Sequence, residues 1–431
     1  MSALNPAFHS ILEPLAWART PSAGCSRCAR CKHAEVNVTS VPRDAQLGPS
    51  VEEAARDWNS FRAAFPTTER FTYLDTARKG LVPVWVEAAM RSWMADVYDN
   101  AGFKAFSMEE TETARAEIAS TFGAPTQCVA LIKNTSEGMN IIAQGLGIQP
   151  GENVVISANE HENNTFPWRY LGGKGIDVRI LPADENAMIP LDAYARAIDR
   201  KTRVVSVAWV SYGAGIRSNI SEIAGLARQH SALTVVDGIQ ATGILNQRVD
   251  TLGADAVICG GHKTLLSLAG AGFIYMREDL IGDIAPSYAA KFSFTSLDRT
   301  VPDLRLAPDA RRFEYGNPNF LGIWAQCNSA RIIRKVGLDR IEQRVRTLSD
   351  RLIAGLDTLG IRVRTPRPWE QRAGIISMDF RRRAGEVVER LEQQRIIVSE
   401  RDKFVRASLY ACNNEADIDT LLNAAEWLKG N

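Results

Sequence analysis

Residues 233–276 decide the fold, and they read LTVVDGIQATGILNQRVDTLGADAVICGGHKTLLSLAGAGFIYM. Three short runs rich in β-branched residues predict three strands in this stretch. Asp237 follows the first run, and Lys263 follows the second after two glycines and a histidine. Ligands of parallel α/β sheets bind at the carboxyl ends of the strands, so we expect this carboxylate and this amine to face one ligand.

The alternation of strand and helix extends over most of the chain. From about residue 51, short β-branched runs alternate with amphipathic stretches such as 221–229. This pattern predicts an α/β fold with a mostly parallel sheet flanked by helices. Seven strands are expected, at residues 128–132, 153–156, 178–181, 204–210, 233–236, 256–259 and 273–276.

The pattern changes after Phe320 and predicts a smaller α+β C-terminal domain. We expect an N-terminal extension over 1–50, a large domain over 51–315, in which 51–75 packs on the small domain, and a small domain over 316–431. Within the small domain the sequence predicts a long helical stretch through Leu359, strands near 374–380, 395–399 and 404–408, and a closing helix over 415–428.

Composition and charge exclude several classes of protein. Lys and Arg number 51 and Asp and Glu number 50, so the formal net charge of +1 predicts no nucleic-acid partner. With 45% hydrophobic and 23% charged residues, the chain resembles globular proteins and not disordered ones. It has no apolar run of the roughly 20 residues that cross a bilayer and no signal-like start, so we expect a cytoplasmic protein without a membrane partner.

Seven cysteines are an odd number for a disulfide framework and favour a reducing compartment. Cys25, Cys28 and Cys31 form C-x-x-C-x-x-C, and His33 follows two positions later. Thiolates at this spacing can bind zinc or an iron–sulfur cluster. No second cysteine pair follows nearby, and the segment is rich in Ser, Pro and Ala. A mobile tail without a metal is therefore the favoured interpretation, and a metal site is the alternative.

A lysine and a carboxylate at neighbouring strand ends suit pyridoxal 5'-phosphate. The lysine forms a Schiff base with the cofactor aldehyde, and the carboxylate keeps the pyridine nitrogen protonated, so that the ring accepts electrons. Thr135 and Ser136 open a helical pattern after a strand and could bind the phosphate. His161 follows the next strand and could lie flat against the ring. The plain alternatives are a surface lysine in a glycine turn, a helix N-cap and a loop histidine.

Together these segments resemble the class V aminotransferase family, which contains cysteine desulfurases, isopenicillin N epimerase and related C–S lyases. The resemblance covers nearly all of the chain from about Phe71 to Leu428 and implies the fold-type-I architecture of pyridoxal phosphate enzymes. It rests on seven motifs in order: Tyr73-Leu-Asp-Thr76, Asn134-Thr-Ser-Glu-Gly138, Glu160-His161, Val236-Asp-Gly-Ile-Gln240, Gly261-His-Lys263, Glu314-Tyr-Gly-Asn-Pro-Asn319 and Val405-Arg-Ala-Ser-Leu409.

The resemblance implies a role for each residue that contacts the cofactor ring. Lys263 would carry the cofactor as a Schiff base, and Asp237 would pair with the pyridinium nitrogen. Gln240 would hydrogen-bond the phenolic oxygen, and His161 would stack on the ring as a third catalytic group. Tyr212 replaces an asparagine that contacts the phenolic oxygen in relatives, so its phenol could stack or relay a proton.

The resemblance also implies ligands for the phosphate and the substrate. Thr135, Ser136 and His262 would hold the phosphate. Asn317 replaces a threonine that reaches the phosphate from the neighbouring subunit, so a homodimer with the active site at the subunit interface is expected. Arg406 would receive the α-carboxylate of a small amino-acid substrate, which suits its bidentate geometry. Arg78 could read a second anionic group on that substrate.

An absent cysteine decides the reaction that we expect. Cysteine desulfurases of this family carry a nucleophilic cysteine just ahead of the strand with the carboxylate-binding arginine, and residues 396–406 contain none. We therefore predict that the chain is not a cysteine desulfurase. We expect a C–S lyase that cleaves an S-substituted cysteine or its sulfoxide by β-elimination in small-molecule biosynthesis, with Lys263 removing the Cα proton.

Two alternatives stay open. An aminotransferase, an epimerase or a decarboxylating oxidative deaminase would use the same Lys263, Asp237 and Arg406, so the sequence does not separate these reactions from elimination. A binding protein that keeps the fold without catalysis is an alternative from another class, with the cysteine-rich tail docking a partner. The retained lysine, aspartate, glutamine and histidine argue against it.

Overall fold

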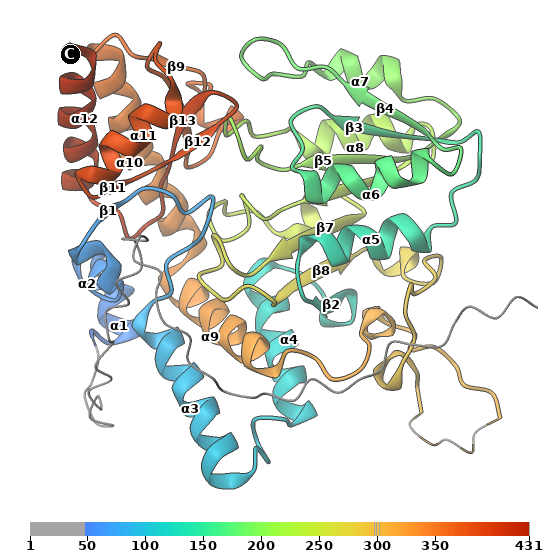
Figure 1. Ribbon diagram of the computed structural model, residues 1–431. Helices are drawn as coiled ribbons and strands as arrows, with labels where there is room; N and C mark the ends of the chain where they lie inside the picture. Colours follow the sequence, from blue (N-terminus) through green and yellow to red (C-terminus); the bar gives the residue numbers. More distant parts are fainter. Residues whose placement is uncertain (1–47, 297, 299, 301, 431) are drawn as a thin grey trace, which may run out of the picture. The chain divides into compact units, whose positions relative to one another are not determined.

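A seven-stranded sheet is the main element of the computed structural model, which describes residues 48–296, 298, 300 and 302–430 (Figure 1). Its strands are β2 (Val129–Ile132), β3 (Asn153–Ser157), β4 (Asp177–Leu181), β5 (Thr202–Ala208), β6 (Leu233–Asp237), β7 (Ala256–Gly260) and β8 (Gly272–Met276). Their order is β2-β8-β7-β6-β5-β3-β4. β8 runs antiparallel to both neighbours, and the other neighbouring pairs are parallel. The predicted mostly parallel sheet of seven strands is confirmed.

Helices cover both faces of this sheet. α5 (Thr135–Gly145) and α6 (Glu162–Gly172) pack against each other on one face, and α7 (Leu191–Ala197) and α8 (Ile220–Arg228) pack on the other (Figure 1). Every residue of β2, β3, β7 and β8 is buried, as expected for strands covered on both sides. Right-handed crossovers between parallel strands explain this arrangement. A connection to a neighbouring strand on one side passes over one face of the sheet, and a connection to the other side passes over the opposite face.

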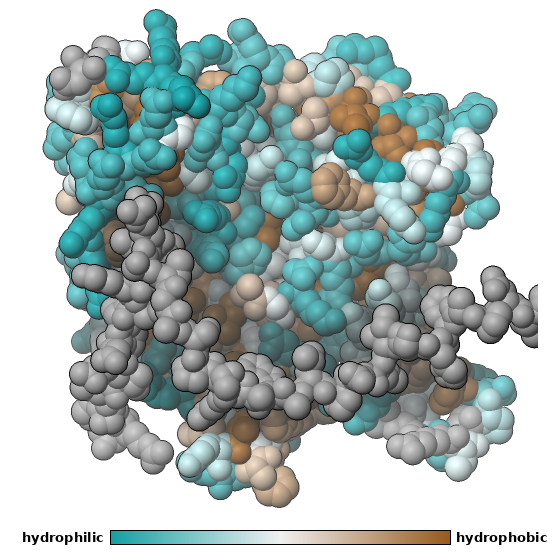
Figure 2. Space-filling view, viewed as in Figure 1, coloured by the Kyte–Doolittle hydropathy of each residue, from teal (hydrophilic) through white to brown (hydrophobic). Residues whose placement is uncertain are grey.

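A four-stranded antiparallel sheet forms in the C-terminal part of the chain, in the order β12-β13-β10-β9. Helices cover it over a separate core of buried apolar residues, and Figure 2 shows a largely hydrophilic surface over this region at the upper left. The predicted α+β character of this part is confirmed. Its elements are β9 (Arg362–Val363), β10 (Ile375–Asp379), β12 (Ser399–Arg401), β13 (Phe404–Ser408), α10 (Leu338–Thr358), α11 (Ala384–Gln393) and α12 (Glu415–Gly430).

The helical stretch that the sequence predicts through Leu359 is two helices and not one. α9 (Phe320–Val336) ends at Gly337, whose φ of 93° lies outside the helical region, and α10 begins directly after it. α9 packs on α3 (Val84–Asn100) and α4 (Met108–Phe122), whereas α10 packs on the small sheet. The glycine therefore redirects the chain from one part of the fold to the other.

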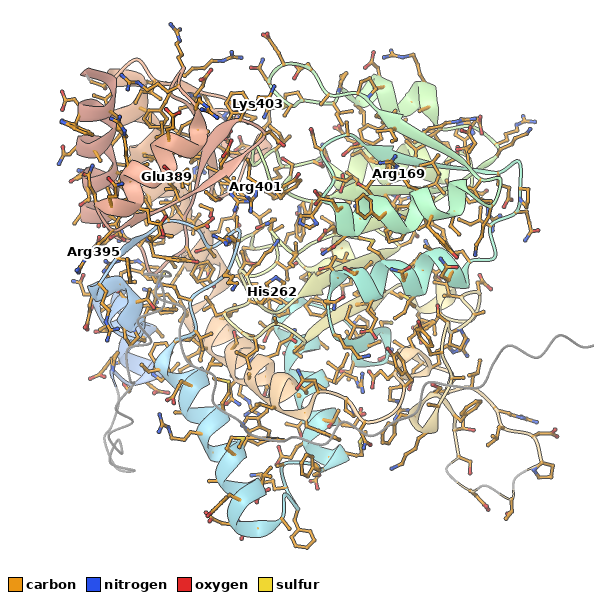
Figure 3. All side chains as sticks on the ribbon, viewed as in Figure 1. Arg169, His262, Glu389, Arg395, Arg401 and Lys403 are labelled. Carbon is orange, nitrogen blue, oxygen red and sulfur yellow. The ribbon has the colours of Figure 1, made fainter. Side chains whose placement is uncertain are left out.

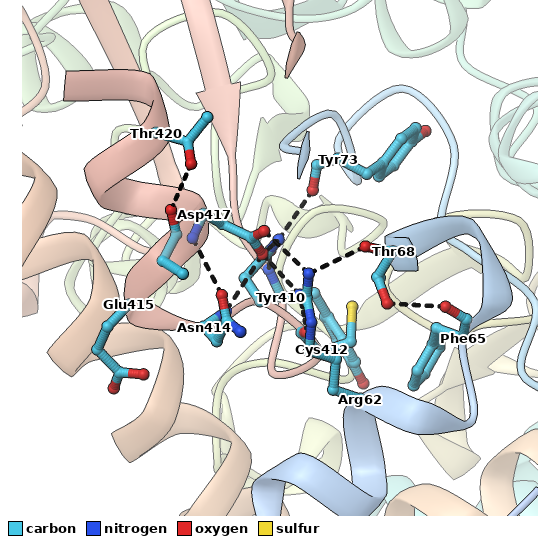
Figure 4. A network of polar contacts seen from close by, with 12 residues as sticks. Arg62, Phe65, Thr68, Tyr73, Tyr410, Cys412, Asn414, Glu415, Asp417 and Thr420 are labelled. Carbon is cyan, nitrogen blue, oxygen red and sulfur yellow. Dashed lines mark hydrogen bonds and ion pairs between the residues drawn. The ribbon is translucent and has the colours of Figure 1, made fainter. Parts of the chain in front are cut away.

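The first described segment lies against the end of the chain. β1 (Thr72–Tyr73) pairs in parallel with β11 (Ile396–Ile397). Arg62, on α2 (Trp58–Ala63), donates hydrogen bonds to both carboxylate oxygens of Asp417 at 2.7 and 3.0 Å (Figure 4). The domain boundaries drawn from the sequence stay a prediction.

No helix within residues 48–430, apart from the gaps named above, is long and apolar enough to cross a membrane. The three cysteines of the N-terminal motif, and most of the predicted extension, lie outside the described residues. The short helices are α1 (Val51–Ala54) and the 3-10 helices Pro66–Glu69, Thr126–Cys128, Val249–Thr251, Glu278–Leu280, Lys291–Ser293, Ala310–Phe313 and Trp369–Gln371.

Candidate active site

Lys263 and Asp237 follow neighbouring strands of the main sheet. Asp237 is the last residue of β6, and Lys263 lies three residues beyond the end of β7, which pairs with β6 in parallel. Asp237 is 5% exposed and Lys263 is 9% exposed. The structure thus brings a buried amine and a buried carboxylate to the same edge of the sheet.

Burial sets the protonation of this pair. It lowers the pKa of Lys263 to about 8; the charge of Asp237 opposes the shift, and those of Arg406 and Arg401 add to it. Burial also raises the pKa of Asp237, whose Oδ1 accepts a hydrogen bond from the Ile239 N–H at 3.0 Å. A lysine with a lowered pKa has a neutral fraction near physiological pH, so its amine can act as a nucleophile or a base.

Polar side chains gather at the N-terminus of α5. Asn134 caps this helix through its Oδ1, which accepts the Glu137 N–H at 2.9 Å. The Oγ1 of Thr135 is buried and has no hydrogen-bond partner among the described residues. A Cβ built on Gly260 would lie 3.4 Å from both this oxygen and the Nδ1 of His262. Two polar side chains therefore lie beside a helix N-terminus, a position that stabilises anions.

His161 caps α6 and lies against Tyr212. Its Nδ1 accepts a hydrogen bond from the Asn163 N–H at 3.1 Å, so the ring proton is on Nε2. The ring meets Tyr212 edge to face, with centroids 5.0 Å apart and an interplanar angle of 74°. Burial and the charge of Lys263 lower the pKa of His161, which favours the neutral imidazole. Whether this ring stacks on a cofactor stays a prediction.

Glu160 forms a buried network that the sequence did not reveal. Its Oε1 accepts hydrogen bonds from the Ser157 hydroxyl at 2.6 Å and the Ala208 N–H at 2.8 Å, and its Oε2 accepts one from Asn164 at 2.6 Å. Burial raises the pKa of Glu160 to about 7, and Asp237 adds to the shift. Because Glu160 directly precedes His161, this network fixes the start of α6. The signal that the sequence offered for this network was a polar residue just after a predicted strand.

Gln240 and Ser136 are two further residues that the sequence predicts as cofactor ligands. Gln240 donates a hydrogen bond through Nε2 to the carbonyl oxygen of Ala77 at 2.9 Å. Its Oε1 is buried and has no partner among the described residues. Ser136 is half-buried, next to Thr135 in the first turn of α5.

Arg406 is buried and already has an acidic partner. Its guanidinium donates to Asp75 Oδ1 at 2.9 Å and to the carbonyl oxygen of Tyr212 at 2.8 Å, and both charged residues are 1% exposed. Ser399 donates to the same Asp75 oxygen at 2.9 Å. The Nε of Arg406 is buried and without a partner among the described residues. Asp75 is part of a motif named in the sequence analysis, but nothing in the sequence indicated its contact with Arg406, which is 331 residues away.

Asn317 lies in the loop before α9, and the cavity that it lines does not include Lys263 or Asp237. It is exposed and lines a separate cavity of about 210 Å³ together with Lys133, Glu137 and Tyr315. The predicted contact between Asn317 and the cofactor of a second subunit stays a prediction.

The segment before Arg406 is a tight hairpin. β12 and β13 are joined by Asp402 and Lys403, both in the left-handed region with φ of 49° and 70°. The connection between the two strands is therefore only two residues long. The cysteines within the described residues are all buried: Cys128, Cys259, Cys327 and Cys412.

The chain matches known proteins over most of its length. The family described as Aminotransferase class-V matches residues 72–421. The chain belongs to the aminotransferase class-V family. A probable cysteine desulfurase from Methanothermobacter thermautotrophicus is 30% identical to this class-V chain, over 69% of the chain and 75% of the relative. A probable cysteine desulfurase from Pyrococcus abyssi is 28% identical, over 85% and 96%.

One solved structure agrees with the sequence relatives. The apo structure of a cysteine desulfurase from Thermococcus onnurineus NA1 matches with a TM-score of 0.79 and 26% identity, over 86% of this class-V chain and 98% of that protein. The resemblance to the family and the fold class are confirmed. The class-V chain is a pyridoxal-phosphate-dependent enzyme of fold type I.

The sequence prediction that this class-V chain is not a cysteine desulfurase is wrong, because the relatives that match it over most of their length carry that name. The same finding overturns the predicted β-eliminating C–S lyase and its alternatives. The prediction relied on one missing loop cysteine. A C–S lyase and a cysteine desulfurase both cleave a C–S bond and differ in what accepts the sulfur, and that acceptor need not be a cysteine of this loop.

Proposed function

We propose that the chain is a cysteine desulfurase that uses pyridoxal 5'-phosphate. The Cβ–Sγ bond of L-cysteine breaks, the sulfur forms an S–S bond with an acceptor thiol, and L-alanine leaves. L-Cysteine and RSH give L-alanine and RSSH, so atoms and electrons balance. The observation that carries the proposal is the buried Lys263 amine at the same sheet edge as Asp237, in a chain whose relatives are cysteine desulfurases.

The residues present fit this cofactor. Lys263 would hold its aldehyde carbon and Asp237 its pyridinium nitrogen, while His161 would lie over the ring. The second amide hydrogen of Gln240 is free to donate to the phenolic oxygen. The orphaned Thr135 hydroxyl is an unused donor at a helix N-terminus, as a phosphate requires.

The same fit extends to Ser136 and His262 beside the phosphate, and to Tyr212 next to His161. Burial lowers the pKa of His262 to about 4, and Lys263 and Lys79 add to the shift. The imidazole is therefore neutral at physiological pH and would contribute a hydrogen bond to the phosphate, without a charge.

The bound cofactor supplies an electron sink for the bonds at the substrate Cα. Arg406 would orient the amino acid by its α-carboxylate, since each terminal nitrogen keeps one unused N–H and Nε is unpaired. Lys263 would take the Cα proton at its Nζ and later return a proton to the product carbon. Its pKa of about 8 suits both transfers.

A thiol would accept the sulfur. Burial raises the pKa of each of the four cysteines in the described part of the chain, which disfavours the thiolate that attacks sulfur. We therefore expect the sulfur acceptor to lie outside the described residues, on Cys25, Cys28 or Cys31, on a thiol in solution or on a partner protein.

A homodimer would complete the cofactor site. The exposed Asn317 is the group that a second subunit would contribute to the phosphate. We expect active protein to elute as a dimer in gel filtration, and an active monomer would contradict this arrangement.

The test is product analysis with L-cysteine and dithiothreitol, using the cofactor-loaded full chain. We expect L-alanine and sulfide in equal amounts. Lys263→Ala removes the amine and should abolish alanine formation, whereas Lys201→Ala, an exposed lysine before β5, should leave it intact. Pyruvate and ammonia in place of alanine would contradict the proposal.

A further inference from the structure

The buried ion pair of Arg406 and Asp75 joins segments that are 331 residues apart. Arg406 lies in β13, and Asp75 lies two residues beyond β1, in a bridge with Ser408. One nitrogen of the guanidinium donates to one oxygen of the carboxylate at 2.9 Å, and both side chains are 1% exposed. Burial strengthens the attraction between the two charges, because little water screens it. The arginine therefore already has a carboxylate from its own chain.

The guanidinium of Arg406 keeps an unused donor although it is buried. Its second terminal nitrogen donates to the carbonyl oxygen of Tyr212 at 2.8 Å, and its Nε has no partner among the described residues. An unpaired buried N–H costs free energy, so this position favours a ligand that brings further acceptor oxygens, as a carboxylate does. Because the arginine is 1% exposed, such a ligand reaches it only by displacing a group that the arginine already holds.

Asp75 offsets the charge of Arg406, and the other charged group nearby is a cation. Ser399 lies opposite Arg406 in the β12–β13 pairing, and Arg401 follows two residues later, so the three side chains point to one face. Figure 3 shows Arg401 at the hairpin, on the side toward His262. Burial lowers the pKa of Arg406, the charge of Asp75 opposes the shift, and that of Arg401 adds to it. Among the described residues, Asp75 is the one ion-pair partner of this arginine.

We infer that Asp75 competes with the α-carboxylate of the amino acid for Arg406 and so sets the affinity of the site for its substrate. This inference rests on the proposed function, in which Arg406 receives that carboxylate. Asp75 keeps the buried guanidinium paired while no substrate is bound. Two carboxylates at one guanidinium repel each other, so Asp75 weakens the binding of the second and favours its release. Asp75 is thus a positioning residue that acts on the substrate through Arg406.

The test is the Kd of L-alanine, the proposed product, measured by calorimetry on the cofactor-loaded full chain. L-Alaninamide, which lacks the carboxylate, is the comparison ligand. Asp75→Asn keeps the size and one acceptor oxygen but removes the charge. It should lower the Kd of L-alanine about tenfold and leave that of L-alaninamide unchanged. A merely structural role of Asp75 predicts the opposite sign, because a misplaced arginine would raise the Kd of L-alanine.

The kinetics of the same variant give a second readout. The KM of L-cysteine should fall with the Kd of L-alanine, without a gain in kcat. The reason is that the α-carboxylate is bound equally before and during the reaction, so its tighter binding does not lower the barrier.

Two further variants separate competition from a general effect of buried charge. Ser399→Ala removes one of the two donors that share the Asp75 oxygen, so that oxygen binds Arg406 more strongly and the Kd of L-alanine should rise. Asp417→Asn removes a buried carboxylate from a different arginine, Arg62, and should leave this Kd unchanged.

The contrary outcomes are distinct. An unchanged or raised Kd of L-alanine in Asp75→Asn overturns the inference, since the carboxylate then binds another cation such as Arg401. An equal fall for L-alaninamide overturns it as well. If Asp75→Asn does not fold, a Ser399→Ala protein in which this Kd does not rise overturns it. If L-cysteine yields no alanine, the proposed function fails, while the comparison of Kd values still decides the inference.

Discussion

Burial sets the protonation of the residues in the site. Desolvation lowers the pKa of Lys263 to about 8 and that of His262 to about 4, and it raises the pKa of Glu160 to about 7. In each case the charged form is disfavoured because the protein interior solvates it less well than water. At neutral pH His262 is therefore neutral, while Lys263 and Glu160 each have a neutral fraction, which lets the lysine act as a nucleophile or a base.

Glu160 provides a prediction at this scale. Its raised pKa means that the folded state binds more protons than the unfolded state between pH 4.5 and about 7. The stability that it contributes is complete below pH 4.5 and is lost as the pH rises to about 7, by roughly 3 kcal/mol in all.

The measurement is the free energy of unfolding of wild type and Glu160→Gln against pH. The free energy of unfolding of the wild type should fall relative to that of the variant as the pH rises through this range. Glu162→Gln, two residues further along the chain and exposed, should show no such trend. A difference that does not vary with pH would show that Glu160 stays charged in the folded protein.

At the scale of elements, single residues decide where helices end and which way a hairpin faces. Gly337 separates α9 from α10, and the register of β12 and β13 places two arginines on one face. A one-residue slip of that register would turn both arginines away from the site.

We predict that Gly337→Ala destabilises the protein by about 1–3 kcal/mol, because a side chain is strained at a φ of 93°. Gly225→Ala is the matched control. Gly225 lies within α8, and a Cβ there would meet nothing within 4 Å, so alanine should stabilise the helix by up to about 1 kcal/mol. Thermal midpoints should move in opposite directions, and equal shifts would contradict the role of the glycine.

At the scale of the molecule, the segment before the main sheet is held by the last helix. Arg62 on α2 binds Asp417 on α12, and the carboxylate side chain is 5% exposed. Asn413 and the Asn414 N–H donate to the same carboxylate at 2.9 and 3.2 Å. Figure 4 shows this network joining the two ends of the described chain.

We predict that Arg62→Met costs about 3–5 kcal/mol, because it leaves a buried carboxylate without its cation. Lys335→Met, which removes an exposed partner of Glu52, should leave the stability nearly unchanged because water screens that ion pair. Urea unfolding measures both. If Arg62→Met/Asp417→Leu is as unstable as Arg62→Met alone, packing and not the uncompensated charge explains the loss.

The sequence was enough to place the residues that follow single strands. Asp237, Lys263, Thr135 and His161 each come within a few residues of a β-branched run, and parallel strands bring their carboxyl ends to one edge. The sheet and its seven strands followed from the same local pattern. These features depend on nearest neighbours in the chain, which a sequence displays directly.

Only the tertiary structure decided the contacts between distant segments. The bonds from Arg406 and Ser399 to Asp75 span 331 and 324 residues, and the inward position of Arg401 depends on strand register. A missing cysteine in one loop suggested the wrong reaction, because the sequence of a loop does not show whether the sulfur acceptor comes from elsewhere. Charge pairing and burial arise from packing between segments, so they exist only once the chain has folded.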